Sequence, residues 1–228
     1  MLYNKDLMND KAFAFIYGYA IRDAILQQAF KGDNKKWIEE ISEAHDVIRG
    51  YANRVLNGDF SENSTEIKAA HDACFIKTAR DVCDVINERR AEGVTGSFSF
   101  GNAQKLINII TKHIYAHSYT LNLLDCVDIR NRFRFCHCPM DSIMLKTVWD
   151  KYGELFGDSQ RRNDLGYSTE FRKSWGSEDF EISDGERIQP QRYTSYQTAI
   201  NRIINEEDMQ IFPMEYDYLV WKAEENNE

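Results

Sequence analysis

A basic segment with interleaved arginines and aromatic rings is the part of the chain whose residue types could do chemistry. Residues 130–135 read Arg-Asn-Arg-Phe-Arg-Phe. In an extended backbone, Arg130, Arg132 and Arg134 would lie on one face and the two phenylalanines on the other. Guanidinium groups bind phosphate through paired hydrogen bonds. The segment therefore predicts an anion site that uses Arg132 and Arg134, and the alternative is a solvated loop with two buried rings.

A polar stripe on the preceding helix could complete that site. The helix expected over residues 102–117, with Asn102 as its N-cap, carries amides and lysines at helical spacing: Gln104, Lys105, Asn108 and Lys112. Amides can read base edges or satisfy buried backbone groups, and lysines add positive charge. An amphipathic helix shows the same stripe beside its apolar face, so both interpretations stay open. The first function predicted is binding of an anionic partner, a nucleotide or nucleic acid.

The spacing of an arginine and a histidine also fits a ribonuclease motif. Arg130 or Arg132 followed by His137 resembles the R-x4–6-H motif of the HEPN superfamily. This resemblance implies a metal-independent ribonuclease in which Arg130, Arg132 and His137 are catalytic. Pro139 disfavours a helical conformation at the residue before it, whereas the family's histidine lies near a helix start. Ribonuclease activity is therefore the alternative, and a protein without catalysis is the first expectation.

The cysteines and remaining histidines do not have the spacing of a metal site. Cys136, His137 and Cys138 are nearly adjacent, and His113 and His117 lie one helical turn apart. Ligands separated by a single residue seldom both reach a tetrahedral ion, and no Cys-x2-Cys pair occurs. A phosphate loop and a dinucleotide fingerprint are also absent. We therefore expect no metal ion and no cofactor.

Two short motifs resemble a known set of proteins. Ala103-Gln104-Lys105 with Asn108 and Lys112, followed by His137-Cys138-Pro139-x-Asp141, resembles uncharacterised helical proteins of bacterial and phage genomes. The likeness covers residues 98–149, with a weaker echo at 213–221. It implies that the two motifs form one site or one packing unit, and it suggests a role in phage–host conflict. It implies no activity. His137 and Asp141 are expected to position the turn, with Asp141 as the N-cap of the next helix.

The elements that must position these residues are mostly helices. Apolar residues recur at three- and four-residue spacing over 11–30, 35–56, 65–92, 102–117, 121–127, 143–156, 193–205 and 213–225. This pattern predicts one all-α domain over residues 1–228, built as a helical bundle. Short alternating stretches predict an irregular or β-ribbon subregion around residues 93–101 and 130–140, in which the two stretches could pair with each other. Helix ends are an equally good explanation of the alternation. Residues 157–191 are predicted to be an ordered loop or insertion.

Charge and composition limit the compartment and the partners. The formal net charge is −9, whereas residues 97–149 are locally basic, which favours an anion site there over a general affinity for nucleic acid. No apolar run could span a membrane and no signal sequence opens the chain, so we expect no membrane partner and a cytoplasmic protein. Residues 206–228 are strongly acidic, which raises a third alternative: a protein–protein inhibitor or nucleic-acid mimic. A homodimer is a further expectation.

Overall fold

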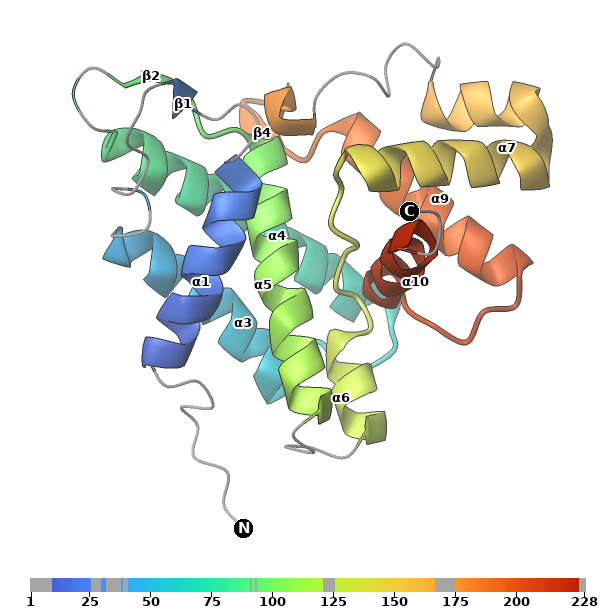
Figure 1. The fold of residues 1–228 in the computed structure, drawn as a ribbon, viewed down its shortest axis with the longest axis horizontal. Helices are drawn as coiled ribbons and strands as arrows, with labels where there is room; N and C mark the ends of the chain where they lie inside the picture. Colours follow the sequence, from blue (N-terminus) through green and yellow to red (C-terminus); the bar gives the residue numbers. More distant parts are fainter. Residues whose placement is uncertain are drawn as a thin grey trace.

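The fold is all-α, as the sequence predicts. The computed structural model describes residues 10–25, 30–31, 38, 41–90, 92, 94–120, 126–166 and 175–225. Within that part lie eight α-helices (Figure 1): α1 (Asp10–Ile25), α3 (Ser42–Asn57), α4 (Thr65–Glu88), α5 (Phe100–Thr120), α6 (Cys126–Phe133), α7 (Ser142–Leu165), α9 (Gln191–Glu206) and α10 (Pro213–Glu225). The predicted helical stretches at 26–29, 35–37, 39–40 and 121–125 lie outside the described residues. No described helix is both long enough and apolar enough to cross a membrane.

Helix α5 is the centre of the molecule. It packs against α1, α4, α6 and the short 3-10 helix η1 (Trp175–Ser177). In Figure 1 it stands between α1 and α3 on one side and the group of α7, α9 and α10 on the other. Residues 100–111 are all buried, including the polar ones. A helix that is buried on every side must find hydrogen-bond partners for its polar side chains inside the protein.

A glycine allows η1 to approach α5 closely. The amide of Gly101 donates to the carbonyl oxygen of Glu178 at 2.8 Å. A Cβ atom at position 101 would lie 1.7 Å from the carbonyl oxygen of Trp175, so any larger residue would force the two segments apart. This contact holds the Trp175 ring 4.6 Å from the ammonium of Lys105.

The helix starts agree only in part with the predicted caps. Asp141 is the N-cap of α7, because its carboxylate accepts from the amides of Ile143 and Met144 at 3.0 Å. The predicted cap at Asn102 is wrong, since α5 begins two residues earlier. Ser99 Oγ accepts from the Asn102 amide at 3.3 Å, and Asn102 Oδ1 accepts from the Ser99 amide at 3.1 Å. These two bonds form a capping box with the serine at its start.

The strands in the described part form two small antiparallel ribbons. Strand β1 (Phe30–Lys31) pairs with β2 (Thr95–Gly96), and β3 (Glu181–Ser183) pairs with β4 (Glu186–Ile188). The predicted irregular region at 93–101 thus contains a strand, but its partner is β1.

Of the two explanations for residues 130–135, the structure has the helix end, because α6 runs to Phe133 and residues 134–141 are turn or irregular. An i,i+4 ion pair between Arg132 and Asp128 at 2.7 Å supports the helix, and Ile129 and Phe133 are buried at the same spacing. The three arginines therefore do not share one face of a strand.

The region predicted as a long loop contains regular structure at both ends. Helix α7 continues to Leu165 and changes direction at Gly157, where φ is +82°. A bidentate ion pair between the Arg187 guanidinium and the Asp84 carboxylate, with hydrogen bonds of 2.8 and 2.5 Å, connects the ribbon of β3 and β4 to α4. Residues 167–174 lie outside the described part. The prediction of a loop over 157–191 is therefore wrong where the end of α7, η1 and the ribbon lie.

Candidate functional site

Two glutamines hold residues 136–141, which we call the connecting segment, between α5 and α9. Gln197 accepts from the Cys138 amide at 3.1 Å and donates to the Cys138 carbonyl at 2.7 Å. Gln104 accepts from the Met140 amide at 3.1 Å and donates to the Met140 carbonyl at 2.7 Å. Pro139, between them, has no amide hydrogen to satisfy. Each glutamine side chain therefore makes the two hydrogen bonds that a neighbouring strand would otherwise make with this buried backbone.

The amides of α5 continue into a buried polar network. Asn108 Nδ2 lies 3.3 Å from Gln104 Oε1 and 3.0 Å from the Tyr193 hydroxyl. That hydroxyl lies 2.9 Å from His137 Nδ1, and His137 Nε2 lies 3.2 Å from Asp72 Oδ1. The two sequence motifs are therefore in contact and form one packing unit. Of the two interpretations of the amides, the structure favours the satisfaction of buried groups.

His71 extends this network on α4. Its Nε2 lies 2.8 Å from the Tyr51 hydroxyl, and its Nδ1 lies 3.2 Å from Asp72 Oδ1. Burial lowers the pKa of His71 to about 4, so the ring is neutral at pH 7. Burial alone would raise the pKa of Asp72, but hydrogen bonds with His137, His71 and Lys68 bring it well below its usual range.

The sequence offered no signal for these contacts. His71, Asp72 and Tyr193 join His137 from positions 56 to 66 residues away along the chain, so no local spacing pattern connects them.

The lysines of α5 point to a different place, a pocket that we call the lysine pocket. It has a volume of about 230 Å³ and lies between α1, α5, α10 and the connecting segment. Its lining includes two lysines, three aspartates and aromatic residues: Lys105, Lys112, Asp23, Asp141, Asp217, His113, Tyr19 and Trp221. Residues of the weaker resemblance at 213–221 therefore line the same pocket as residues of the two stronger motifs.

Both lysines in that pocket already have carboxylate partners. Lys105 Nζ lies 3.0 Å from Asp23 and 3.7 Å from Asp141, and Lys112 forms an ion pair with Asp217. The Asp217 side chain is only 2% exposed, and burial raises its pKa although Lys112 opposes the rise. With three aspartates facing two lysines, an incoming anion would have to displace a carboxylate from a lysine.

Two of the three arginines of the basic segment hold helices together. Arg130 forms a bidentate ion pair with Glu215, with hydrogen bonds of 3.0 and 3.2 Å, and donates to the Gln210 carbonyl at 2.6 Å. Arg132 donates to the Leu56 carbonyl at the end of α3 and pairs with Asp128. The acidic C-terminal region is likewise not a uniform surface, since Glu215 is part of this internal contact.

Arg134 differs from its neighbours because, among the described residues, no carboxylate lies within ion-pair distance of it. Its Nη2 donates to Asn131 Oδ1 at 2.6 Å, its Nε is buried with no hydrogen-bond partner, and its guanidinium carbon lies 5.8 Å from the centre of the Phe212 ring. It lines a cavity of about 430 Å³, the arginine cavity, between the start of α4, the end of α6 and the end of α9. The other lining residues combine one more cation, a carboxylate, amides and apolar groups, among them Lys68, Asp208, Asn63, Asn201, Asn205, Phe135 and Ile211.

The six predicted binding residues therefore separate into four groups. Gln104 and Asn108 satisfy buried groups, Lys105 and Lys112 lie in the lysine pocket, Arg132 ties α6 to α3, and Arg134 lines the arginine cavity. The structure brings Lys68 and the asparagines to Arg134, and the sequence did not single those residues out.

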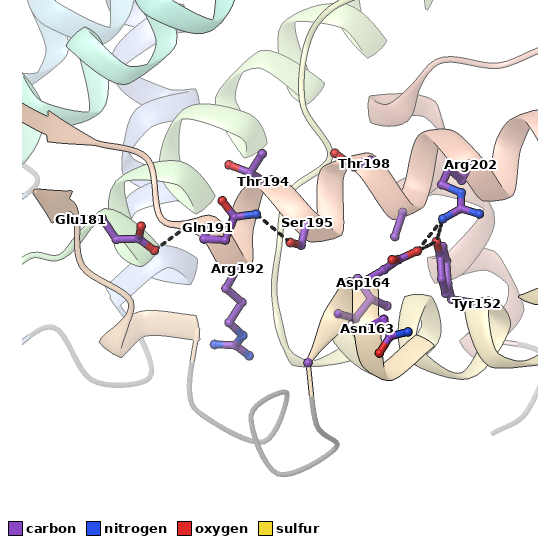
Figure 2. Close-up of a pocket in the computed structure, with 13 residues that line it drawn as sticks. Tyr152, Asn163, Asp164, Glu181, Gln191, Arg192, Thr194, Ser195, Thr198 and Arg202 are labelled. Carbon is purple, nitrogen blue, oxygen red and sulfur yellow. Dashed lines mark hydrogen bonds and ion pairs between the residues drawn. The ribbon is translucent and has the colours of Figure 1, made fainter. Parts of the chain in front are cut away.

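An open groove of about 690 Å³ lies between α7 and α9. Figure 2 shows its polar side chains in separate groups, with Glu181, Gln191 and Ser195 near the start of α9, and Asp164, Tyr152 and Arg202 further along. Its two arginines are already in ion pairs, Arg202 with Asp164 at 2.5 Å and Arg192 with Glu178 at 2.8 Å. The groove therefore does not present an uncompensated arginine to a ligand.

The arginines and the histidine of the predicted ribonuclease motif have different partners. Arg130 contacts Glu215 of α10 and Arg132 contacts α3, whereas both ring nitrogens of His137 are engaged by Asp72 and Tyr193. The neighbouring thiols are buried, and burial raises the pKa of Cys136 to about 12 and that of Cys138 well above its usual value. These thiols are therefore protonated and poor nucleophiles at neutral pH.

Comparison with known proteins identifies no relative, since no family model, curated protein or solved structure matches the chain. The resemblance to the helical proteins of bacterial and phage genomes therefore stays a prediction.

Proposed function

We propose that this protein binds a small anionic ligand in the arginine cavity, with a phosphate group of the ligand held by Arg134. The observation that supports the proposal is the uncompensated guanidinium of Arg134. It faces a cavity whose volume of about 430 Å³ falls within the range of small-molecule sites. A guanidinium with unused donors is the side chain best suited to a phosphate.

The rest of the lining fits a ligand of about the size of a mononucleotide. Phe135, Ile211 and Phe212 offer apolar surface for a base or a sugar. Asn201 and Asn205 carry amides that can pair with base edges, and the Lys68 ammonium adds a second positive charge. The ammonium of Lys68 is shared with Asp72 at 2.6 Å, so Arg134 carries the larger part of the attraction.

A small ligand fits the charge of the molecule better than a nucleic-acid chain does. The net charge of −9 repels a polyanion, whereas one phosphate in a local basic cavity meets little of that repulsion. The inhibitor alternative has less support, because Glu215 and Asp217 of the acidic region are engaged inside the protein with Arg130 and Lys112.

The proposal is tested by calorimetric titration of the protein with AMP. We expect saturable binding by the wild-type chain, an affinity about tenfold or more weaker in Arg134→Ala, and partial recovery in Arg134→Lys, which keeps the charge but not the fork. Arg80→Ala is a matched control, since Arg80 is a partly exposed arginine of α4 that pairs with Glu186.

The salt dependence distinguishes the outcomes. Affinity for AMP should fall as NaCl rises in the wild type and depend less on salt in Arg134→Ala. Equal affinities of the wild type and Arg134→Ala for AMP would contradict the proposal, as would no detectable binding of AMP, ADP or inorganic phosphate. Binding of single-stranded RNA that is tighter than binding of AMP would point to a nucleic-acid partner.

A further inference from the structure

Two imidazole rings and a carboxylate meet at one point next to the connecting segment. His71 and Asp72 come from α4, and His137 comes from the connecting segment. Asp72 Oδ1 lies 3.2 Å from His71 Nδ1 and 3.2 Å from His137 Nε2. One ligand atom from each of the three side chains lies within 4.8 Å of the others.

These distances fit the edges of a small coordination sphere. Zinc lies about 2.0–2.1 Å from a histidine nitrogen and about 2.0–2.2 Å from a carboxylate oxygen, so two such ligands at a tetrahedral angle are about 3.3 Å apart. Two of the three edges match this value. The third, between the two imidazole nitrogens, is at most 4.8 Å, and a small rotation of the rings shortens it.

Each candidate ligand is also oriented by a second contact. The ring nitrogen of His71 that points away from Asp72 lies 2.8 Å from the Tyr51 hydroxyl, and the corresponding nitrogen of His137 lies 2.9 Å from the Tyr193 hydroxyl. The second oxygen of Asp72 is held by Lys68 at 2.6 Å. Metal-binding histidines characteristically have such a partner on the other ring nitrogen, which fixes the ring and the tautomer.

We infer that His71, Asp72 and His137 bind a divalent first-row transition ion such as Zn²⁺ through two nitrogens and one oxygen. This donor set suits Zn²⁺ or Fe²⁺ and leaves coordination positions open for water or a ligand. Cys136 and Cys138 are not part of it, which is why their spacing gave no metal signal.

The same geometry can hold two protons in place of the ion. A carboxylate only accepts, so in neutral rings the protons are on His71 Nδ1 and His137 Nε2, and the phenols of Tyr51 and Tyr193 donate to the other nitrogens. When an ion binds, each ring becomes the other tautomer and donates to its phenol. Because a phenol oxygen both donates and accepts, the contact with each tyrosine is kept.

The ion would have a route to solvent. The two imidazoles are buried, but the Asp72 side chain is 25% exposed. Lys68, which contacts Asp72, also lines the arginine cavity. The inference does not require that cavity to bind a nucleotide, since it rests on the three ligands and their partners.

The test is binding of Zn²⁺ and Co²⁺ to chelator-treated protein. We expect one Zn²⁺ per chain by calorimetry, and a Tm about 5–10 °C higher when free zinc exceeds Kd a hundredfold. Asp72→Asn and His137→Ala should each weaken binding at least about a hundredfold, since each removes one of three ligands. His113→Ala is the matched control, because His113 lies in the lysine pocket and should leave the affinity unchanged.

Either of two results would overturn the inference: no saturable Zn²⁺ or Co²⁺ binding by the wild type, or wild-type affinity in both ligand variants. Should the variants fail to fold, nitrogen-15 NMR of the wild-type histidines decides the matter. Zinc should move the proton from Nδ1 to Nε2 in His71 and from Nε2 to Nδ1 in His137. Unchanged tautomers at saturating zinc would also overturn it.

Discussion

The lysine pocket and the arginine cavity each have two cations in their lining but differ in how those charges are compensated. In the lysine pocket, Lys105 and Lys112 face three aspartates, and the Asp217 partner of Lys112 is almost fully buried. The arginine cavity is larger and has one carboxylate, Asp208, in its lining, but the hydrogen-bond partner of Arg134 there is the neutral amide of Asn131. A basic side chain in such a motif is therefore available to bind an anion only where no carboxylate of the same chain already pairs with it.

The largest expected effect comes from breaking the compensation in the lysine pocket. Lys112→Met removes the partner of the buried Asp217 and should lower the free energy of unfolding by about 3–5 kcal/mol at pH 7. Loss of the ammonium raises the pKa of Asp217 further above its unfolded value. The stability of the variant is therefore fully present below about pH 4 and is lost as the pH rises through the folded pKa.

The measurement is urea unfolding of the wild type and Lys112→Met at pH 4 and pH 7. The difference between the two proteins should be larger at pH 7, and adding Asp217→Asn to the variant should restore part of the loss. A difference that is the same at both pH values would mean that the pair is not what stabilises this pocket.

The next largest effect is expected where the amides serve the backbone. Gln197→Ala leaves the buried amide of Cys138 without a partner and its carbonyl with only the 3.5 Å contact from Asn108, and should cost about 2–4 kcal/mol of unfolding free energy. The matched variant Gln197→Glu keeps an acceptor at every pH and has a donor only when its carboxyl is protonated, so it should cost less at a pH where the new carboxyl is protonated. Chemical denaturation followed by far-UV circular dichroism measures the unfolding free energy of both variants. A loss below about 0.5 kcal/mol for Gln197→Ala would show that the contact of Gln197 with the Cys138 backbone does not stabilise the fold.

A smaller effect separates the neighbouring arginines. Arg130→Ala removes the two-fold contact with Glu215, a partly exposed pair, and should cost about 1 kcal/mol of stability. Arg134→Ala removes a contact with a neutral amide and should cost about 0.5 kcal/mol or less. Thermal unfolding of the two variants in parallel provides the comparison, and the reverse order would show that Arg134 is the structural residue of the pair.

The sequence predicted the framework better than it predicted the sites, for reasons that particular residues make clear. Helices such as α4 and α9 follow from apolar spacing, and the cap at Asp141 follows from a local pattern of a few residues. The form of residues 130–133 was left open by the sequence, because alternation of arginine and phenylalanine suggests a strand while burial of Ile129 and Phe133 at i,i+4 favours a helix.

The candidate sites could be predicted only in part, since they depend on contacts distant in sequence. The sequence identified Arg134 and His137 as residues of interest and joined the two motifs into one unit. It could not show that Asp217 neutralises Lys112 across 105 residues, or that Gln104 clamps Met140 across 36. Nor could it connect His71 and Asp72 with His137, because these come together only after α4 packs beside the connecting segment.

The most direct test of the difference between the two regions is the affinity for AMP of Arg134→Ala and Lys105→Met, measured side by side by calorimetry. Each variant removes one positive charge, Arg134→Ala from the arginine cavity and Lys105→Met from the lysine pocket. We predict that Arg134→Ala weakens binding about tenfold or more, while Lys105→Met changes it less than about twofold. A loss confined to Lys105→Met would contradict the proposal and place the anion in the lysine pocket.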